Sequence, residues 1–258
     1  MATSFDYATQ ARTYDTTRAA SPSVLAPLRA ALGPPSGRLV DVGGGTGNYA
    51  AALAGDGWDA LVLDRSADML AVAAAKGLEV CRGDAASLPL ASGSAASVML
   101  VSMLHHVPDW ASALAEARRV AGPRGRVVLM TFTREHLLEV HGVARWFPET
   151  TAHFAAGHQR LADLVAALPG ATVEPILYAD LVDGSMAALL RQPELLLDPD
   201  LRRQTSFFEW AERHRPDELA HGLRLLEADL AAGWARDADE RRRLELGDAS
   251  VLTWLARN

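Results

Sequence analysis

The stretch "LVDVGGGTGNYAAALA" at residues 39–54 decides how this chain folds. Apolar residues surround Asp41, four glycines follow between residues 43 and 47, and an alanine-rich helical pattern begins at once. This order predicts a buried strand, a sharp turn and a helix. Because glycine has no Cβ, such a turn lets a ligand approach the backbone and its N–H groups closely.

The same order of strand and helix repeats along the first half of the chain. We expect strands at 38–42, 60–64, 78–84, 96–102 and 125–132, and helices at 46–55, 66–77 and 109–122. Each expected helix ends at a glycine, which suits a helix C-terminus. Helices of these lengths fit right-handed crossovers between parallel strands.

The regular alternation stops after Phe132. Residues 133–170 contain two expected helices, and we expect the last two strands at 171–182 and 247–257. Residues 184–246 are strongly helical in pattern and read as an inserted cap. The predicted fold class is therefore α/β, a Rossmann-like, mostly parallel seven-stranded sheet with helices on both faces and a helical cap. The expected domains are a core at 1–183, the cap at 184–246 and the last core strand at 247–258.

Composition excludes several classes of function. The net charge of −7 leaves no basic footprint for nucleic acid or an anionic membrane. One cysteine, Cys81, excludes an internal disulfide, and the histidines have no metal-ligand spacing, so we expect no metal. No apolar run is long enough to span a bilayer. We expect a soluble cytoplasmic protein, and the sequence does not indicate its oligomeric state.

Two acids narrow the choice of ligand. Dinucleotide enzymes bind a pyrophosphate at such a turn and use an acid about 20 residues later for the ribose, a place that Asp64 fills. Asp41 stands directly before the glycines, where it would repel a diphosphate and attract a cationic group. S-adenosylmethionine (SAM) carries an ammonium and a sulfonium and has no phosphate, so it fits this pattern better.

Five motifs in register make the chain resemble the class I SAM-dependent methyltransferases. They are "VDVGGGTG", "LVLDRSADML", "GDAASLPL", "SVMLVSMLHHVPD" and "GPRGRVVL". The resemblance covers residues 5–132 and is greatest to the subgroup that includes the ubiquinone/menaquinone methyltransferases and many natural-product enzymes. It implies SAM as cofactor, S-adenosylhomocysteine (SAH) as product, and an antiparallel last strand.

The resemblance also assigns contacts to the cofactor. It implies that Asp64 binds the ribose, Met69 packs on the adenine and Asp84 accepts from the adenine amino group. In the segment "FDYATQARTYDTTR", it places Tyr14 and Arg18 at the methionine end, with Arg18 paired to the carboxylate. The remaining expected cofactor residues are Asp41, Gly43, Gly45, Gly47, Asn48, Arg65, Ala85 and Ser102.

The expected reaction is methyl transfer to an O, N or C nucleophile of a small, partly apolar metabolite, in specialised metabolism. Catalysis would come mainly from aligning the two reactants. His106 follows the fourth strand and is the candidate general base, although it can equally be part of the wall of the site. Two rivals remain: a SAM-binding module without catalysis, and a nucleotide-dependent oxidoreductase.

Aromatic residues outside the motifs have two open interpretations. They can line an apolar pocket for the methyl acceptor, or they can dock the cap on the sheet. These residues are Trp146, Phe147, Phe154, Phe207, Phe208 and Trp210.

Overall fold

The computed structural model describes residues 20–140, 142–179, 186–233 and 237–255. The chain forms two compact units. The first unit comprises residues 1–131, 163–173 and 251–258, and the second comprises residues 132–162 and 174–250. Each unit is described by itself.

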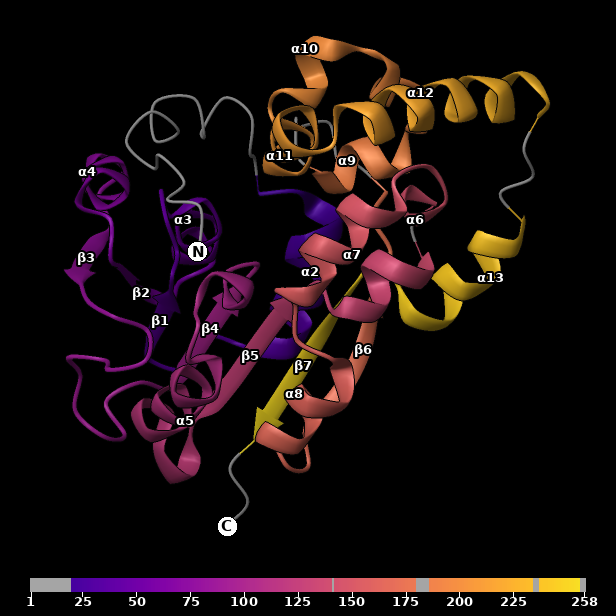
Figure 1. The fold of residues 1–258 in the computed structure, drawn as a ribbon. Coiled ribbons are helices and arrows are strands. Elements are labelled where there is room, and N and C mark those ends of the chain that lie inside the picture. Colours follow the sequence, from indigo (N-terminus) through magenta and orange to yellow (C-terminus); the bar gives the residue numbers. More distant parts are fainter. Residues whose placement is uncertain (1–19, 141, 180–185, 234–236, 256–258) are drawn as a thin grey trace. The chain divides into compact units, whose positions relative to one another are not determined.

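Seven strands form one sheet in the order β3-β2-β1-β4-β5-β7-β6. Their bounds are β1 (Arg38–Val42), β2 (Asp59–Asp64), β3 (Glu79–Arg82), β4 (Ser97–Val101), β5 (Arg126–Thr131), β6 (Thr172–Ile176) and β7 (Ala249–Leu255). The strands β1 to β5 pair in parallel, and β7 runs opposite to β5 (Figure 1). The predicted α/β sheet with its reversed last strand is confirmed, and β6 and β7 are shorter than expected.

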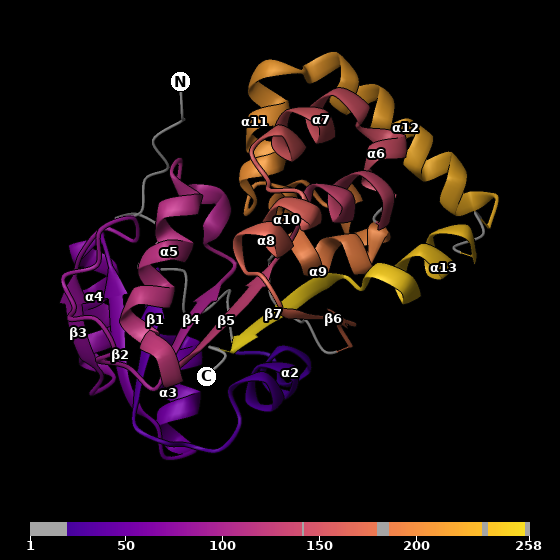
Figure 2. The same cartoon turned by 90° about the horizontal axis from the view of Figure 1, so that it is seen from below.

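Helices cover both faces of the sheet in the first unit. They are α2 (Pro22–Leu32), α3 (Asn48–Gly55), α4 (Ala67–Ala75) and α5 (Trp110–Ala121), with 3₁₀ turns η1 (Leu104–His106) and η2 (Gly122–Arg124). Figure 2 shows α5 on the opposite face from α2 and α3. Strands β1 and β4 are almost completely buried because helices pack on both sides, which explains why most of their residues are apolar.

The second unit is helical. It contains the π-helix η3 (His136–Val140), α6 (Val143–Trp146), α7 (Pro148–Ala156), α9 (Met186–Arg191), η4 (Pro193–Leu197), α10 (Pro199–Arg202), α11 (Ser206–His214), α12 (Pro216–Ala231) and α13 (Asp237–Leu246). A further helix, α8 (Leu161–Ala167), begins in this unit and ends in the first. The region 133–170 therefore holds several short helices where two were expected.

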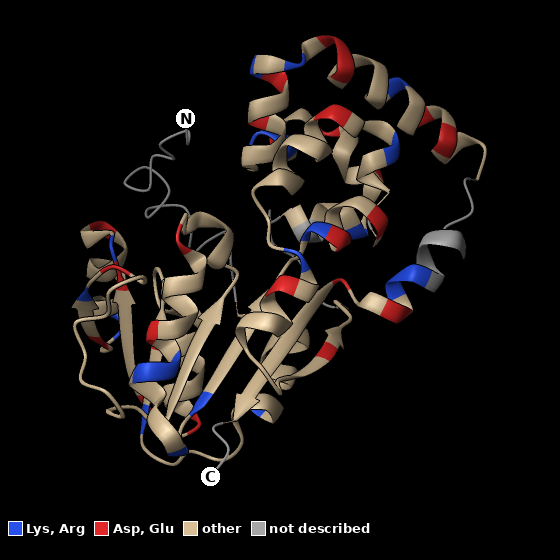
Figure 3. Cartoon of the chain, turned by 60° about the horizontal axis from the view of Figure 1, so that its bottom comes forward, with Lys and Arg blue, Asp and Glu red and all other residues tan. Residues whose placement is uncertain are grey.

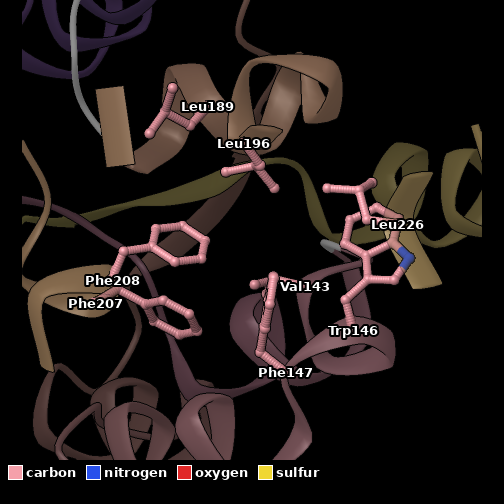
Figure 4. Packing of buried hydrophobic residues seen from close by; sticks show 8 residues of the cluster. All are labelled: Val143, Trp146, Phe147, Leu189, Leu196, Phe207, Phe208 and Leu226. Atoms are coloured by element: carbon pink, nitrogen blue, oxygen red, sulfur yellow. The ribbon is translucent and has the colours of Figure 1, made fainter. Parts of the chain in front are cut away.

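Aromatic side chains form the core of the second unit. Val143, Trp146, Phe147, Leu189, Leu196, Phe207, Phe208 and Leu226 are buried in one cluster, and Figure 4 shows their side chains converging. Phe147 lies edge-on to Phe208, with ring centroids 5.2 Å apart. This packing joins α6 and α7 to α11 and α12. The second unit consequently begins near residue 132, well before the expected cap boundary at 184.

Charges of both signs are interspersed along the described ribbon (Figure 3). Within the described ranges, the chain has no helix that is both long and apolar enough to cross a membrane.

Candidate functional site

The glycine turn between β1 and α3 adopts backbone conformations that favour glycine. Gly43, Gly45 and Gly47 have φ values of 67°, 57° and 74°. A Cβ at Gly43 would lie 2.6 Å from Met103 Cε, and a Cβ at Gly47 would lie 2.6 Å from Leu78 Cδ1. A Cβ at Gly45 would have no atom within 4 Å. Gly45 thus borders open space, where a ligand can approach the backbone.

Asp64, the last residue of β2, orders this turn. Its Oδ2 accepts a hydrogen bond from Gly45 N at 3.0 Å, and its Oδ1 accepts one from Ser66 N at 2.8 Å. Ser66 in turn caps α4, because its Oγ accepts from Met69 N at 3.4 Å. The carboxylate therefore lies between the glycine turn and the start of the next helix.

Asp41 is a buried carboxyl group without a hydrogen bond at one of its oxygens. Its side chain is 2% exposed, and no described residue is a hydrogen-bond partner of Oδ1. Burial, together with the nearby charge of Asp64, raises the pKa of Asp41 to about 7. The backbone at Gly44 lies close to this carboxyl group, since a Cβ there would lie 2.5 Å from Asp41 Oδ2. This arrangement suits a cationic partner and disfavours an anionic one.

Four further expected cofactor residues lie in the segments that follow β2 and β3, and two of them, Met69 and Asp84, were expected at the adenine. Met69 and Ala85 are buried. Arg65 is exposed, and its carbonyl accepts from Arg82 Nε at 3.1 Å. Asp84 is also exposed, and its Oδ1 accepts from Ala86 N at 2.9 Å. Contact of these four residues with the cofactor stays a prediction.

Ser102 follows β4 in a strained conformation. Its φ of 52° is the only positive value among the described non-glycine residues. Its N–H donates to Met130 O at 2.9 Å, and its Oγ donates to Met130 Sδ at 3.5 Å. Backbone strain of this kind concentrates at functional positions, which agrees with the place of Ser102 in the fourth-strand motif.

The histidine pair lies in η1, just after Ser102. His106 is exposed, and its ring centroid is 3.9 Å from that of His105. Asp109 follows and caps α5 by accepting from Ser112 N at 3.1 Å. Hydrogen bonds from the side chain and then the backbone of Ser112 lower the pKa of its carboxyl group. The structure thus places His106 at the same edge of the sheet as the glycine turn, because β1 and β4 are parallel neighbours.

Three residues of this region were not predicted from the sequence. Met103 packs where a side chain at Gly43 would stand, and Thr46 is buried inside the turn. Lys76 Nζ donates to Thr46 O at 2.9 Å and also to Asn48 Oδ1. The expected contact of Asn48 with the methionine moiety stays a prediction. Tyr14 and Arg18 lie outside the described residues.

The residues present fit SAM better than a dinucleotide. A buried carboxyl group with a raised pKa adjoins a glycine turn that is open at Gly45, and a second carboxylate closes the turn. A diphosphate would add negative charge beside both acids, whereas a cation would neutralise Asp41. Within the described ranges, no group of three or more histidine, cysteine or acidic residues is placed to hold a metal ion.

Comparison with known proteins agrees with this geometry. A methyltransferase domain model matches residues 40–129. The demethylmenaquinone methyltransferase of Mycolicibacterium vanbaalenii is 36% identical over 99 residues, covering 38% of this chain and 43% of the relative. The ubiquinone biosynthesis O-methyltransferase of Methylococcus capsulatus is 37% identical over 132 residues, covering 46% and 56%. The chain therefore spans about half the length of these curated relatives.

A solved structure extends the likeness beyond the motifs. A candidate methyltransferase of an antibiotic biosynthesis pathway from Anabaena variabilis has a TM-score of 0.70 and 26% identity, over 90% of this chain and 96% of that chain. The motif register, the acids at the glycine turn, the sheet order and these matches agree. Together they support the assignment of this chain to the class I SAM-dependent methyltransferases, with a methyltransferase domain matched over residues 40–129.

Proposed function

We propose that this protein transfers a methyl group from SAM to a small, partly apolar acceptor. The observation that carries the proposal is Asp41, a buried acid with a raised pKa at the open glycine turn. When bound, SAM supplies a methyl group that its sulfonium already activates. The protein's task is then to bind both reactants and align them.

The residues at and around the turn have separate tasks in this proposal. Asp41 offers a carboxylate to the cationic part of the cofactor, and Asp64 accepts hydrogen bonds from the ribose hydroxyls. Gly45 leaves room for the cofactor beside the backbone. Met69 supplies an apolar contact for the adenine.

His106 has two possible roles. As a base, a neutral imidazole would take the acceptor's proton, and turnover would fall at acidic pH, where the imidazole is protonated. As part of the wall, it would leave the pH profile unchanged. We expect single-turnover rates of His106→Gln, measured across pH with saturating SAM, to separate these roles. A loss on the order of 10²–10⁴-fold supports the base, and a near-normal rate with the same acid limb rejects it.

The acceptor class is inferred from the relatives. Those relatives are named for demethylmenaquinone and for ubiquinone biosynthesis. We propose a ring compound with an oxygen or carbon nucleophile, and a nitrogen nucleophile is the second candidate. Specialised metabolism is the setting we propose, because one similar structure is assigned to an antibiotic pathway.

Calorimetry with SAM, SAH and NADH tests the cofactor first. We expect SAM and SAH to bind and NADH not to bind. Asp64→Asn should weaken SAM binding by about tenfold or more, because a charge-assisted hydrogen bond is lost. The control Asp59→Asn, at the other end of β2, removes an exposed acid that pairs with Arg38 and should leave binding unchanged. Binding of NADH in place of SAM would favour the oxidoreductase.

Labelled SAM tests the reaction itself. Single-turnover incubation with reduced quinone precursors and with a bacterial metabolite extract should place the label in one small product. If SAM binds but no acceptor becomes labelled, the chain is a SAM-binding module without catalysis.

A further inference from the structure

Lys76 is unusual in both composition and place. It is the only lysine among 25 lysine and arginine residues. It stands at the C-cap of α4, where its N–H donates to Ala73 O at 3.1 Å, and Gly77 follows with a φ of 81°. The helix end thereby fixes where its long side chain starts.

From there the ammonium group reaches the glycine turn. It donates to the carbonyl of Thr46, directly before Gly47, and to the side chain of Asn48 in the first turn of α3. Leu78, two residues after Lys76, fills the space beside Gly47. The connection from α4 to β3 therefore holds the turn by an apolar contact and by hydrogen bonds from a cation.

The turn needs such support. Three of its glycines have positive φ, and within the described part of the chain no side chain caps the N-terminus of α3. Asp64 holds the turn through the N–H of Gly45, and Lys76 holds it through the carbonyl of Thr46. An ammonium suits this position because it is a compact charge with three donors.

We propose that Lys76 is a positioning residue for SAM binding, tethering the glycine turn from the far side so that Gly45, Asp41 and Asp64 are preorganised. This proposal rests on the proposed function. Lys76 acts through Thr46 and Asn48 and does not touch the cofactor. The binding energy of SAM is then not spent on ordering the turn.

The test compares Lys76→Met, which keeps the side-chain length without the donors, with Lys76→Arg, which keeps the charge. The control is Arg203→Met, which removes an exposed basic residue on the second unit. Calorimetry should show SAM and SAH bound about tenfold more weakly by Lys76→Met. We expect Lys76→Arg to recover most of this loss and Arg203→Met to bind as the wild type does.

Two further measurements separate positioning from general stability. Amide hydrogen exchange of residues 45–48 in the ligand-free protein should accelerate in Lys76→Met and return toward normal in Lys76→Arg. Lys76 carries the only side-chain primary amine, so its acetylation by an N-hydroxysuccinimide ester, followed by mass spectrometry, should be slower with SAH bound.

The outcomes are distinct. If the wild type binds SAM and Lys76→Met binds it within twofold, the positioning role is overturned while the proposed function stands. A lower melting temperature with unchanged SAM affinity also overturns it, because Lys76 would then be merely structural. If the wild type binds neither SAM nor SAH, the proposed function fails, and this inference fails with it.

Discussion

Two buried aspartates, one in each unit, differ in their hydrogen-bond partners. In the second unit, Asp248 is fully buried and accepts from Arg243 Nε and Nη2, both at 2.8 Å. Tyr178 N donates to it at 2.7 Å. In the first unit, Asp41 is just as buried, yet no described residue bonds to its Oδ1.

The different hydrogen bonding of the two aspartates indicates which one stabilises the fold and which one can bind a ligand. A buried charge is costly unless it is paired, so Asp248 with Arg243 is a complete structural pair. Among the described residues Asp41 has no such partner, and we expect its carboxyl group to pair with a cation of the ligand. We therefore interpret the second unit's polar core as structural and the first unit's glycine turn as the binding site.

The largest expected effect comes from breaking the complete pair. Arg243→Met leaves Asp248 buried without its cation and should lower the free energy of unfolding by about 3–5 kcal/mol. The neighbouring Arg242 is partly exposed and pairs with Glu139, so Arg242→Met should cost only about 0–1 kcal/mol. Urea denaturation measures both variants. Equal, small losses would mean that the buried pair is not structural.

Replacing Asp41 should raise the free energy of unfolding instead of lowering it. Folding raises the pKa of Asp41 from 3.8 to about 7, so its stabilising effect is full below pH 4 and is lost as the pH rises to 7. Asp41→Asn removes this loss and should stabilise the ligand-free protein at pH 8 by as much as roughly 4 kcal/mol.

The same substitution should strongly weaken SAM binding, because the anionic partner of the cation is gone. Denaturation at pH 5 and pH 8 with calorimetry at pH 8 measures the two effects together. If Asp41→Asn is less stable than the wild type at pH 8, this interpretation of Asp41 is incorrect.

A histidine of the second unit should give a smaller effect with the opposite pH dependence. His136 is buried, Thr133 N donates to its Nδ1 at 2.9 Å, and its Nε2 lies 3.1 Å from Leu246 O. Burial lowers the pKa of His136, so the stability it contributes is full above pH 6.5 and falls as the pH drops below 6.5.

The slope from one such group is at most about 1.4 kcal/mol per pH unit. It opposes the slope from Asp41, so we expect it to be visible in the Asp41→Asn background and to become smaller when His136→Gln is added. Burial also lowers the pKa of His158, which keeps part of the slope in the double variant. An unchanged slope in the double variant would show that His136 does not titrate with folding.

The smallest effect on cofactor binding is expected at Trp210. Its ring stacks on His153 at 3.9 Å and on His214 at 4.9 Å, all within the second unit. Trp210→Ala should change SAM affinity by less than about twofold, because we expect no contact between this side chain and the ligand. A loss of SAM affinity equal to that of Asp64→Asn would place Trp210 at the cofactor site.

The strands of the first unit could be predicted closely because local signals define them. Strand 38–42 was predicted at the bounds it has, since an apolar run is followed directly by glycines. The second unit's extent could not be predicted. It depends on Phe147 meeting Phe207 and Phe208 across 60 residues of sequence, and pattern alone does not name such partners.

The same distinction holds for the site. The position of Asp41 and Asp64 at the glycine turn could be predicted because they lie at fixed offsets from the glycines. Lys76 could not, because its contact with Thr46 spans 30 residues and depends on where α4 ends. The lone lysine in an arginine-rich chain was the available signal.

The central claim is that the Asp41 carboxylate pairs with the cationic part of SAM. The number of protons released when SAM binds tests this claim most directly. Calorimetry at pH 6.5 in two buffers of different ionisation enthalpy measures it. With a pKa of about 7, Asp41 is mostly protonated at this pH. We expect the wild type to release on the order of three quarters of a proton more than Asp41→Asn when SAM binds. Equal proton release by the two proteins, with SAM bound to both, would contradict the claim.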